Sequence, residues 1–281
     1  DGETGAASTM VAVNNIAPTN VVVTASAAEI DEGDSITLSG SFDDAGTQDT
    51  HTVVITWGDG SAHTTLDLVA GVLTFSVSHI FLDDNPTGSA SDLNTITVTV
   101  SDDDTGSPGS STSVTVNNVA PVLDPITGPA GNVGVRGQTL TFSGQFLDVG
   151  TLDTHQVTWN FGDGTGDFGP LAATQGTPFS INHIFAASGT YTVSGTVVDD
   201  DGGIGVVTTQ VTIVAAGLQV DSCDPARSML VVGGTGSDDA IVIHPLGSDG
   251  KVQVMIDGIG IGAFQPTGRP AAHGQRGNDT L

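Results

Sequence analysis

The chain has 281 residues, of which 32 are acidic and only 5 are basic, so its formal net charge at neutral pH is −27. A surface of this charge repels nucleic acid and anionic membranes and concentrates cations. Because only 13% of the residues are charged and 37% are hydrophobic, the chain can build cores and is not an acidic disordered tail.

The composition predicts an all-β fold. Thr, Val, Gly, Asp and Ser are abundant, and no segment shows a long apolar pattern with the 3.6-residue period of a helix. The single cysteine, Cys223, excludes an intramolecular disulfide. No apolar run reaches the length of a membrane span, and no signal peptide is recognisable. We expect an internal piece of a longer chain, so the lack of a signal does not bear on export.

Residues 1–17 resemble the end of a repeat. Asp1 to Val13 reads DGETGAASTMVAV and leads into NNIAPT, much as DDDTGSPGSSTSVTV leads into NNVAPV further on. We therefore predict that this stretch is the last strand, near Thr9–Val13, and the linker of a preceding repeat. An edge strand without its own sandwich is a template for pairing, either along this chain or on a neighbouring molecule.

One stretch occurs twice. FDDAGTQDTHTVVITWGDG begins at Phe42 and FLDVGTLDTHQVTWNFGDG begins at Phe146. The two copies align without a gap at an offset of 104, and this offset holds over residues 33–81 of the first copy. A match at constant spacing is an internal repeat. We predict one repeat over 18–118 and a second over 119–215.

Alternating apolar residues predict short strands in both repeats. In the first repeat they are Ile36–Phe42, Val53–Trp57, Leu73–Val77, Ile96–Val100 and Val114–Val116. In the second repeat they are Leu140–Phe146, Val157–Phe161, Phe179–Ile181, Val193–Val197 and Val211–Ile213. About seven short strands in about 100 residues is the size of an immunoglobulin-like (Ig-like) sandwich.

The repeats also resemble a known family. WGDGS at 57–61 and FGDGT at 161–165 are each followed by His-Ile-Phe and by a VxDDDxG segment, and these motifs are similar to those of PKD (polycystic kidney disease) domains. The first copy departs from the pattern, since its His-Ile-Phe region is longer and has Asn94 in place of a tyrosine. The resemblance implies a usually non-catalytic Ig-like sandwich of secreted and surface proteins.

Residues 216–281 differ in character. GTGSDDAI at 234–241 and GQRGNDTL at 274–281 resemble the glycine-aspartate calcium repeat of RTX-type β-rolls, with Asp239 and Asp279 as candidate ligands. Between them, the pattern predicts a hairpin of Lys251–Ile256 and Ile261–Phe264 around Asp257-Gly258. We expect a small β-domain or the start of a β-roll.

Acidic loops are predicted to meet at one pole of each sandwich and to bind Ca²⁺, which takes six to eight oxygen ligands. The PKD resemblance implies calcium at the same pole. The alternative is that these aspartates cap turns and stay solvated. The candidate ligands are Asn15, Asp43, Asp44, Asp49, Asp102 and Asp104 in the first repeat, and Asn118, Asp148, Asp153, Asp199 and Asp201 in the second.

The histidines are interpreted as structural. His79 and His183 have inward parity, and each is predicted to bond the aspartate of its GDG turn, Asp59 or Asp163. His51 and His155 begin a strand beside an acidic loop, where a structural role is again favoured over a metal role. For Asp83, Asp84 and Asp92, in the longer region of the first repeat, turn capping is favoured over a further metal site.

The sequence contains no nucleophile elbow, P-loop or zinc motif, so we expect no enzyme activity. The first hypothesis is a structural or adhesive module of a large secreted or cell-surface repeat protein, stiffened by Ca²⁺ at its junctions. Its partners would be further repeats of the same chain, or other subunits through strand addition to form a filament. The alternative is an accessory module of a secreted hydrolase that binds a glycan or a protein and shows an exposed aromatic row. We expect neither nucleic-acid binding nor membrane insertion.

Overall fold

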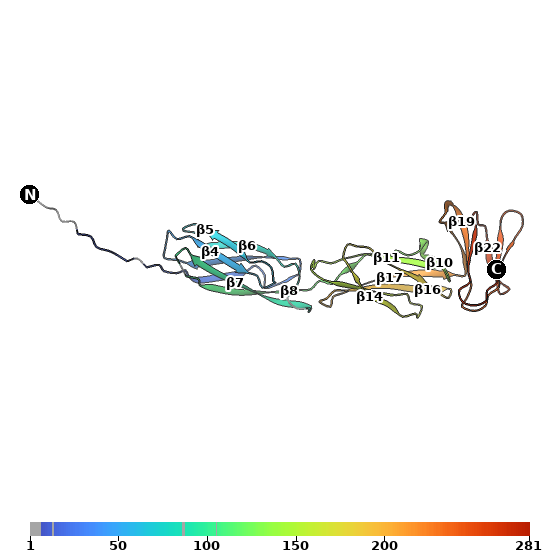
Figure 1. The fold of residues 1–281 in the computed structure, drawn as a ribbon, viewed down its shortest axis with the longest axis horizontal. Coiled ribbons are helices and arrows are strands. Elements are labelled where there is room, and N and C mark those ends of the chain that lie inside the picture. Colours follow the sequence, from blue (N-terminus) through green and yellow to red (C-terminus); the bar gives the residue numbers. More distant parts are fainter. Residues whose placement is uncertain (1–6, 13, 86–87, 105) are drawn as a thin grey trace, which may run out of the picture. The chain divides into compact units, whose positions relative to one another are not determined.

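The chain is all-β, with two Ig-like sandwiches in tandem and a small β-domain after them (Figure 1). The computed structural model describes residues 7–12, 14–85, 88–104 and 106–281. The chain divides into two compact units. The first contains residues 1–119 with 149–153, and the second contains 120–148 with 154–281. The described part of the chain holds no helix that is long and apolar enough to cross a membrane.

The first repeat is a sandwich of two sheets. One sheet has the strand order β2-β8-β7-β4-β5 and the other has the order β1-β3-β6. The short strand β2 runs parallel to β8, whereas the other pairs are antiparallel. The bounds are β1 Thr19–Ala25, β2 Glu29–Asp31, β3 Ser35–Asp43, β4 His51–Thr56, β5 Thr64–Leu68, β6 Thr74–Ile80, β7 Ser91–Asp102 and β8 Gly109–Asn117.

The core of this sandwich is made by the inward residues that the alternation predicted. Trp57 and Phe81 are fully buried, and they pack with Ile36, Leu38 and Ile55. Side chains at alternate positions of a strand share one face, so each strand buries one row and exposes the other. This core shares no residue with the core of the second repeat.

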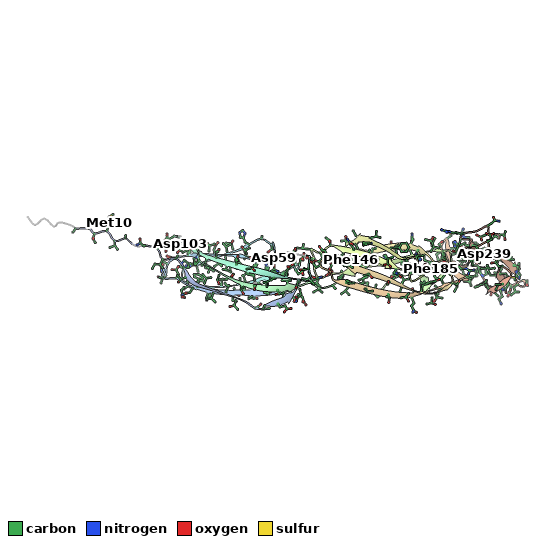
Figure 2. All side chains as sticks on the ribbon, turned by 90° about the horizontal axis from the view of Figure 1, so that it is seen from below. Met10, Asp59, Asp103, Phe146, Phe185 and Asp239 are labelled. Carbon is green, nitrogen blue, oxygen red and sulfur yellow. The ribbon has the colours of Figure 1, made fainter. Side chains whose placement is uncertain are left out.

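The second repeat has the same plan. A five-stranded sheet with the order β10-β17-β16-β13-β14 faces the pairs β11-β15 and β9-β12. Figure 2 shows Phe146 and Phe185 within this sandwich, where both are fully buried. The bounds are β9 Val122–Leu123, β10 Val133–Val135, β11 Thr139–Gly144, β12 Phe146–Leu147, β13 His155–Asn160, β14 Asp167–Ala173, β15 Phe179–Ile184, β16 Gly189–Val198 and β17 Ile204–Val214, with a 3₁₀ turn over Ala130–Asn132.

The C-terminal β-domain has its own core of Leu230, Val232, Ile241, Val254 and Ile256. It contains two three-stranded sheets, with the orders β18-β19-β23 and β20-β21-β22. The strands are β18 Ala216–Asp221, β19 Asp224–Gly233, β20 Ile241–Pro245, β21 Val252–Ile256, β22 Ile259–Phe264 and β23 Pro270–His273.

The predicted hairpin in this domain is confirmed. Ile256 pairs directly with Ile259, which leaves a two-residue loop of Asp257 and Gly258. Both loop residues have positive φ, at 50° and 77°. Two positive φ values are what the type I′ hairpin turn requires, and Asp-Gly is among the dipeptides that adopt it best.

The structure departs from the sequence prediction at the N-terminus and in several strands. The described residues 7–12 form no strand and are exposed, because a strand needs a ladder partner and these residues have none here; Val13 lies outside the described residues. Of the strands in the two sandwiches, β1, β2, β5, β9, β10 and β14 were not predicted. β5 reads TTLDL and has no buried residue, so its apolar pattern is too weak to detect.

Candidate metal centre

The acidic loops of the first repeat meet at one end of its sandwich, which we call the N-terminal pole. Asp44, Asp49 and Asp102 each place a carboxylate oxygen within 4.8 Å of the other two. Asp44 follows β3, Asp49 precedes β4 and Asp102 ends β7, so three strand ends supply the group. Figure 2 shows the neighbouring Asp103 at this pole, with Asp59 toward the opposite end of the sandwich.

The incoming chain is tied to the same group. The side-chain amide of Asn15 donates a hydrogen bond of 2.8 Å to Oδ2 of Asp102. Asn15, Asp49 and Asp104 line an open hollow of about 470 Å³. These donors are all oxygen atoms, and carboxylate and amide oxygens are the ligands that Ca²⁺ prefers. The residues present therefore fit a calcium ion.

Charge repulsion at this pole contributes to a raised pKa of one carboxyl group, that of Asp49. Partial desolvation, followed by the negative charges of its aspartate neighbours, raises the pKa of Asp49 above its ordinary value. The neighbours are Asp44, Asp103, Asp104 and Asp102. A bound cation removes such repulsion and holds the carboxyl group ionised.

Two predicted ligands make hydrogen bonds of their own. The carboxylate of Asp43, a residue that pairs with Thr19 between β3 and β1, accepts a hydrogen bond of 2.8 Å from the side chain of Asn20 and is not a member of the group of Asp44, Asp49 and Asp102. Asp44 bonds Nε2 of His51 at 2.6 Å and accepts the N–H of Gly46 at 2.9 Å. Burial alone would raise the pKa of Asp44, but Gly46 and His51 hold it below its ordinary value.

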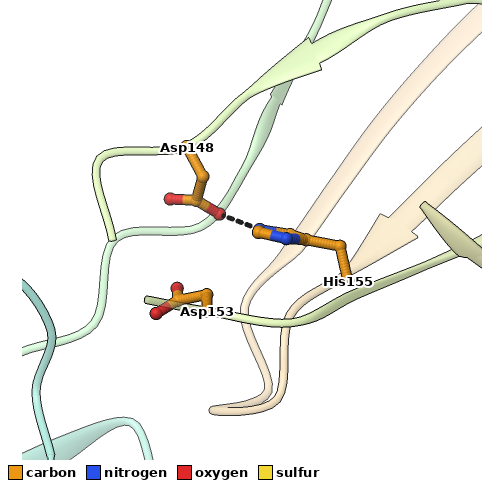
Figure 3. A group of neighbouring side chains, drawn as sticks. All are labelled: Asp148, Asp153 and His155. Atoms are coloured by element: carbon orange, nitrogen blue, oxygen red, sulfur yellow. Dashed lines mark hydrogen bonds and ion pairs between the residues drawn. The ribbon is translucent and has the colours of Figure 1, made fainter. Parts of the chain in front are cut away.

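The equivalent loop of the second repeat is shown in Figure 3. Asp148 bonds Nε2 of His155 at 2.8 Å, and Asp153 belongs to the loop that connects these two residues along the chain. The histidine thus orients the aspartate as His51 orients Asp44. Of the other predicted ligands here, Asp199 and Asp201 are buried, and Asp199 accepts the N–H groups of Asp201 and Gly203. Asn118 and Asp153 belong to the first compact unit.

Asp239 and Asp279 cap turns. The carboxylate of Asp239 accepts the N–H and the hydroxyl of Thr235 at 2.6 and 3.0 Å, and Asp279 accepts the N–H of Asp239 at 3.0 Å. Within the described residues, neither belongs to a group of three possible metal ligands. The strands β19 and β23 before the two turns are parallel, so the two glycine-aspartate copies lie side by side.

One carboxylate group was anticipated only in part from the sequence, which offered Asp83, Asp84 and Asp92 as a further metal site but favoured turn capping for them and did not include Glu32. Glu32, Asp83 and Asp84 each place an oxygen within 4.8 Å of the others at the opposite end of the first sandwich, which we call the C-terminal pole. Glu32 and Asp84 are fully buried. The signal in the sequence was the alignment of the repeats, because Arg136 stands in the second repeat where the first has Glu32.

The predicted histidine–aspartate bonds of the GDG turns are confirmed. His79 lies 2.6 Å from Asp59 and His183 lies 2.7 Å from Asp163. His79 also stacks on Trp57, with ring centroids 4.2 Å apart. Burial alone would raise the pKa of Asp163, but hydrogen bonds from Thr165 and His183 hold it below its ordinary value of 3.8. These pairs are structural ties between a turn and the sandwich.

A pH-dependent contribution to stability follows. Because the pKa of Asp163 is lowered on folding, its carboxylate stabilises the fold above pH 3.8, and this contribution is lost as the pH falls through the lower folded-state pKa. We expect Asp163→Asn to lower the free energy of unfolding by about 1–2 kcal/mol at neutral pH. In urea titrations the difference from wild type should shrink as the pH falls below 3.8. The exposed Asp124→Asn is the control, and an equal loss there would contradict the assignment.

The comparisons with known proteins agree with the fold. The paired sandwiches are Ig-like, and a family model described as "PKD domain" matches residues 118–214. The two repeats are therefore PKD-like, since the first aligns with the second at a constant offset of 104 over residues 33–81.

Three solved structures are similar to the chain. The PKD domain of an M14-like peptidase from Thermoplasmatales archaeon SCGC AB-540-F20 is 26% identical, with a TM-score of 0.30 over 34% of this chain and 97% of that one. A tetra-tandem repeat in the extending region of a large adhesion protein is 15% identical, with a TM-score of 0.42 over 84% and 55%. The amphioxus IgVJ-C2 molecule is 16% identical, with a TM-score of 0.34 over 66% and 99%. The search of curated proteins found no match.

Proposed function

We propose that this chain is a non-catalytic structural or adhesive module of a large secreted or cell-surface repeat protein, and that Ca²⁺ at the N-terminal pole of each repeat stiffens the junctions. The observation that supports it is the group of Asp44, Asp49 and Asp102, to which the incoming residue Asn15 is hydrogen-bonded. An ion held by these residues would contact both the sandwich and the chain that enters it. It would thereby restrict the motion of one domain against the next.

The residues of this chain have separate parts in that role. Asp49 and Asp102 supply charge, Asn15 supplies the link to the preceding segment, and His51 holds Asp44 in position. The bound ion supplies the positive charge that neutralises the carboxylates. We propose the same division of roles for the second repeat, with Asn118, Asp148, Asp153, Asp199 and Asp201 as the candidate ligands.

The glycan-binding alternative lacks its expected surface. The large hydrophobic side chains that are exposed in the described part of the chain are aliphatic or methionine, with no aromatic among them. Phe168, Tyr191 and Phe264 are only half-exposed.

Strand addition by Thr9–Val13 to another subunit stays a prediction. Sedimentation of the full chain, which measures its oligomeric state, is the test.

Thermal unfolding with and without a calcium chelator tests the proposal. A ligand that binds only the native state at about 100 times its Kd stabilises that state by about 2.7 kcal/mol. For domains of this size we expect chelation to lower the unfolding midpoint by about 10–20 °C. Small-angle scattering of the same samples should show more bending between domains after chelation.

Matched variants assign the calcium-dependent change in the unfolding midpoint to particular residues. Asp49→Asn should abolish most of the calcium-dependent shift of the first repeat, whereas Asp103→Asn, an exposed residue near the same group, should keep it. An unchanged midpoint in wild type on chelation would contradict the proposal and assign these aspartates to turn capping.

A further inference from the structure

We propose that the first repeat has a second divalent-cation site, at its C-terminal pole, formed by Glu32, Asp83 and Asp84 with the side-chain amide oxygen of Asn94. This site is separate from the group of Asp44, Asp49 and Asp102 and does not depend on it. Its ligands would all be oxygen atoms, which Ca²⁺ prefers. Softer metals prefer sulfur and imidazole ligands, and none of these four residues offers one.

The three carboxylates are buried together. One oxygen of each lies within 4.8 Å of the other two, and the exposed fractions of Glu32 and Asp84 are 1% and 0%. Ionised carboxylates repel strongly at this separation when water is excluded, and a cation between them reverses the sign of the interaction. Asp83 is also oriented by Asn85, whose side-chain and backbone N–H groups donate to its two oxygens.

Asn94 is an independent indication of a ligand. Its side chain is 1% exposed, and within the described residues neither its amide nitrogen nor its amide oxygen has a hydrogen-bond partner. Buried polar groups are nearly always satisfied, so an amide with no protein partner implies that something else binds it. A cation would take the amide oxygen as a ligand.

The second repeat shows where the Asn94 side chain is directed. Asn94 pairs with Val114 across β7 and β8, and Tyr191 holds the same register position opposite Val211. The hydroxyl of Tyr191 donates a hydrogen bond of 2.9 Å to the carbonyl oxygen of Ala187, which is the equivalent of Asp83. From this register we infer that a side chain at the position of Asn94 points toward the segment of Asp83 and Asp84.

The four residues of the proposed site differ together between the repeats. Glu32, Asp83, Asp84 and Asn94 of the first repeat are replaced in the second by Arg136, Ala187, Ser188 and Tyr191, respectively. In the second repeat a tyrosine closes this pole with a hydrogen bond and a ring contact to Phe185, with centroids 4.7 Å apart. The first repeat has three carboxylates and no tyrosine at these positions, as expected if a bound cation stabilises this pole in place of the ring.

The site would also fix the outgoing chain. Oε1 of Glu32 accepts the backbone N–H of Val119 at 2.7 Å, and Val119 is the last residue of the continuous part of the first compact unit. A cation bound to Glu32 therefore orders the point at which the chain leaves this repeat.

Counting bound calcium tests the site. The full chain is stripped with a chelator and titrated with radioactive Ca²⁺ in equilibrium dialysis, as wild type and as the variants Glu32→Gln, Asp84→Asn and Asp34→Asn. Gln at position 32 keeps an oxygen for the N–H of Val119, and Asp34 is an exposed residue of the same turn that serves as the control. We expect Glu32→Gln and Asp84→Asn to lose about one bound ion per chain, or to bind it at least about tenfold more weakly, and Asp34→Asn to match wild type.

Two further measurements distinguish loss of the ion from misfolding of a variant and from loss of the ion at the N-terminal pole. In wild type, the side-chain amide NMR signal of Asn94, assigned by its loss in Asn94→Leu, should shift on addition of Ca²⁺, and this readout does not depend on the folding of a charged variant. Asp49→Asn should lose its own ion at the N-terminal pole of the first repeat and leave the Asn94 shift intact, which separates this site from the calcium site proposed at that pole. Unchanged binding in folded Glu32→Gln together with an unmoved Asn94 signal would overturn the proposal and assign the space to buried water.

Discussion

Replacing Trp159 with alanine is expected to unfold the second repeat at a much lower temperature and to leave the first repeat unchanged. Trp159 is fully buried against Phe161 and Phe179 in a core of its own. Truncating a buried tryptophan removes both its apolar contacts and the volume they fill, at a cost of about 3–5 kcal/mol. For a domain of about 100 residues this corresponds to a fall in the midpoint of roughly 12–40 °C.

The chain provides its own probe for this experiment, because it contains two tryptophans and each lies in a different sandwich. In Trp159→Ala the remaining fluorescence comes from Trp57 and reports the first repeat, whereas circular dichroism reports the whole chain. The reciprocal variant, Trp57→Ala, leaves Trp159 to report the second repeat. Trp159→Phe is the milder control. If both repeats lost stability together in either alanine variant, the independence of the two cores would be disproved.

The sequence predicts the cores well because the buried residues of each strand are apolar residues at alternate positions. The row of Ile36, Leu38 and Phe42 and the row of Val53, Ile55 and Trp57 are inward in both the prediction and the structure. A strand has only two faces, so a short apolar pattern is enough to assign them. The histidine–aspartate bonds were predictable for the same reason, since parity placed His79 and His183 on the inner face near a turn aspartate.

The polar sites were harder to predict because their residues come from distant segments. Glu32 joins Asp83 and Asp84 across about fifty positions, and no local pattern connects them. Asp43 shows a related difficulty. It stands next to Asp44 in the sequence, but it ends β3 and bonds Asn20, whereas Asp44 lies beyond the strand and bonds His51. Neighbouring positions in an extended chain point to opposite sides, so a run of aspartates rarely acts as one ligand set.

Replacing Gly58 with alanine is expected to destabilise the first repeat far more than the same change at Gly60, two residues further along the GDG turn. Both glycines have positive φ, at 94° and 79°. A Cβ at Gly58 would lie 2.8 Å from the backbone N and O of Thr95 on β7, whereas a Cβ at Gly60 would meet nothing within 4 Å. Left-handed strain alone costs about 1–2 kcal/mol, which is the whole expected effect at Gly60.

At Gly58 the clash is with backbone atoms, which cannot rotate away, so the turn must move off β7 and draw Asp59 away from His79. We expect a total loss of more than about 3 kcal/mol, measured by urea unfolding of the tryptophan signal. The second repeat supplies a replicate, since a Cβ at Gly162 would lie 2.7 Å from the carbonyl oxygen of Thr192 and one at Gly164 would meet nothing within 4 Å. Equal losses at the first and second glycines would refute the close approach. A larger loss of stability at the first glycine than at the second, in both repeats, would show two different roles. The first glycine allows the turn to pack against the sheet, and the second only allows the positive φ of the turn.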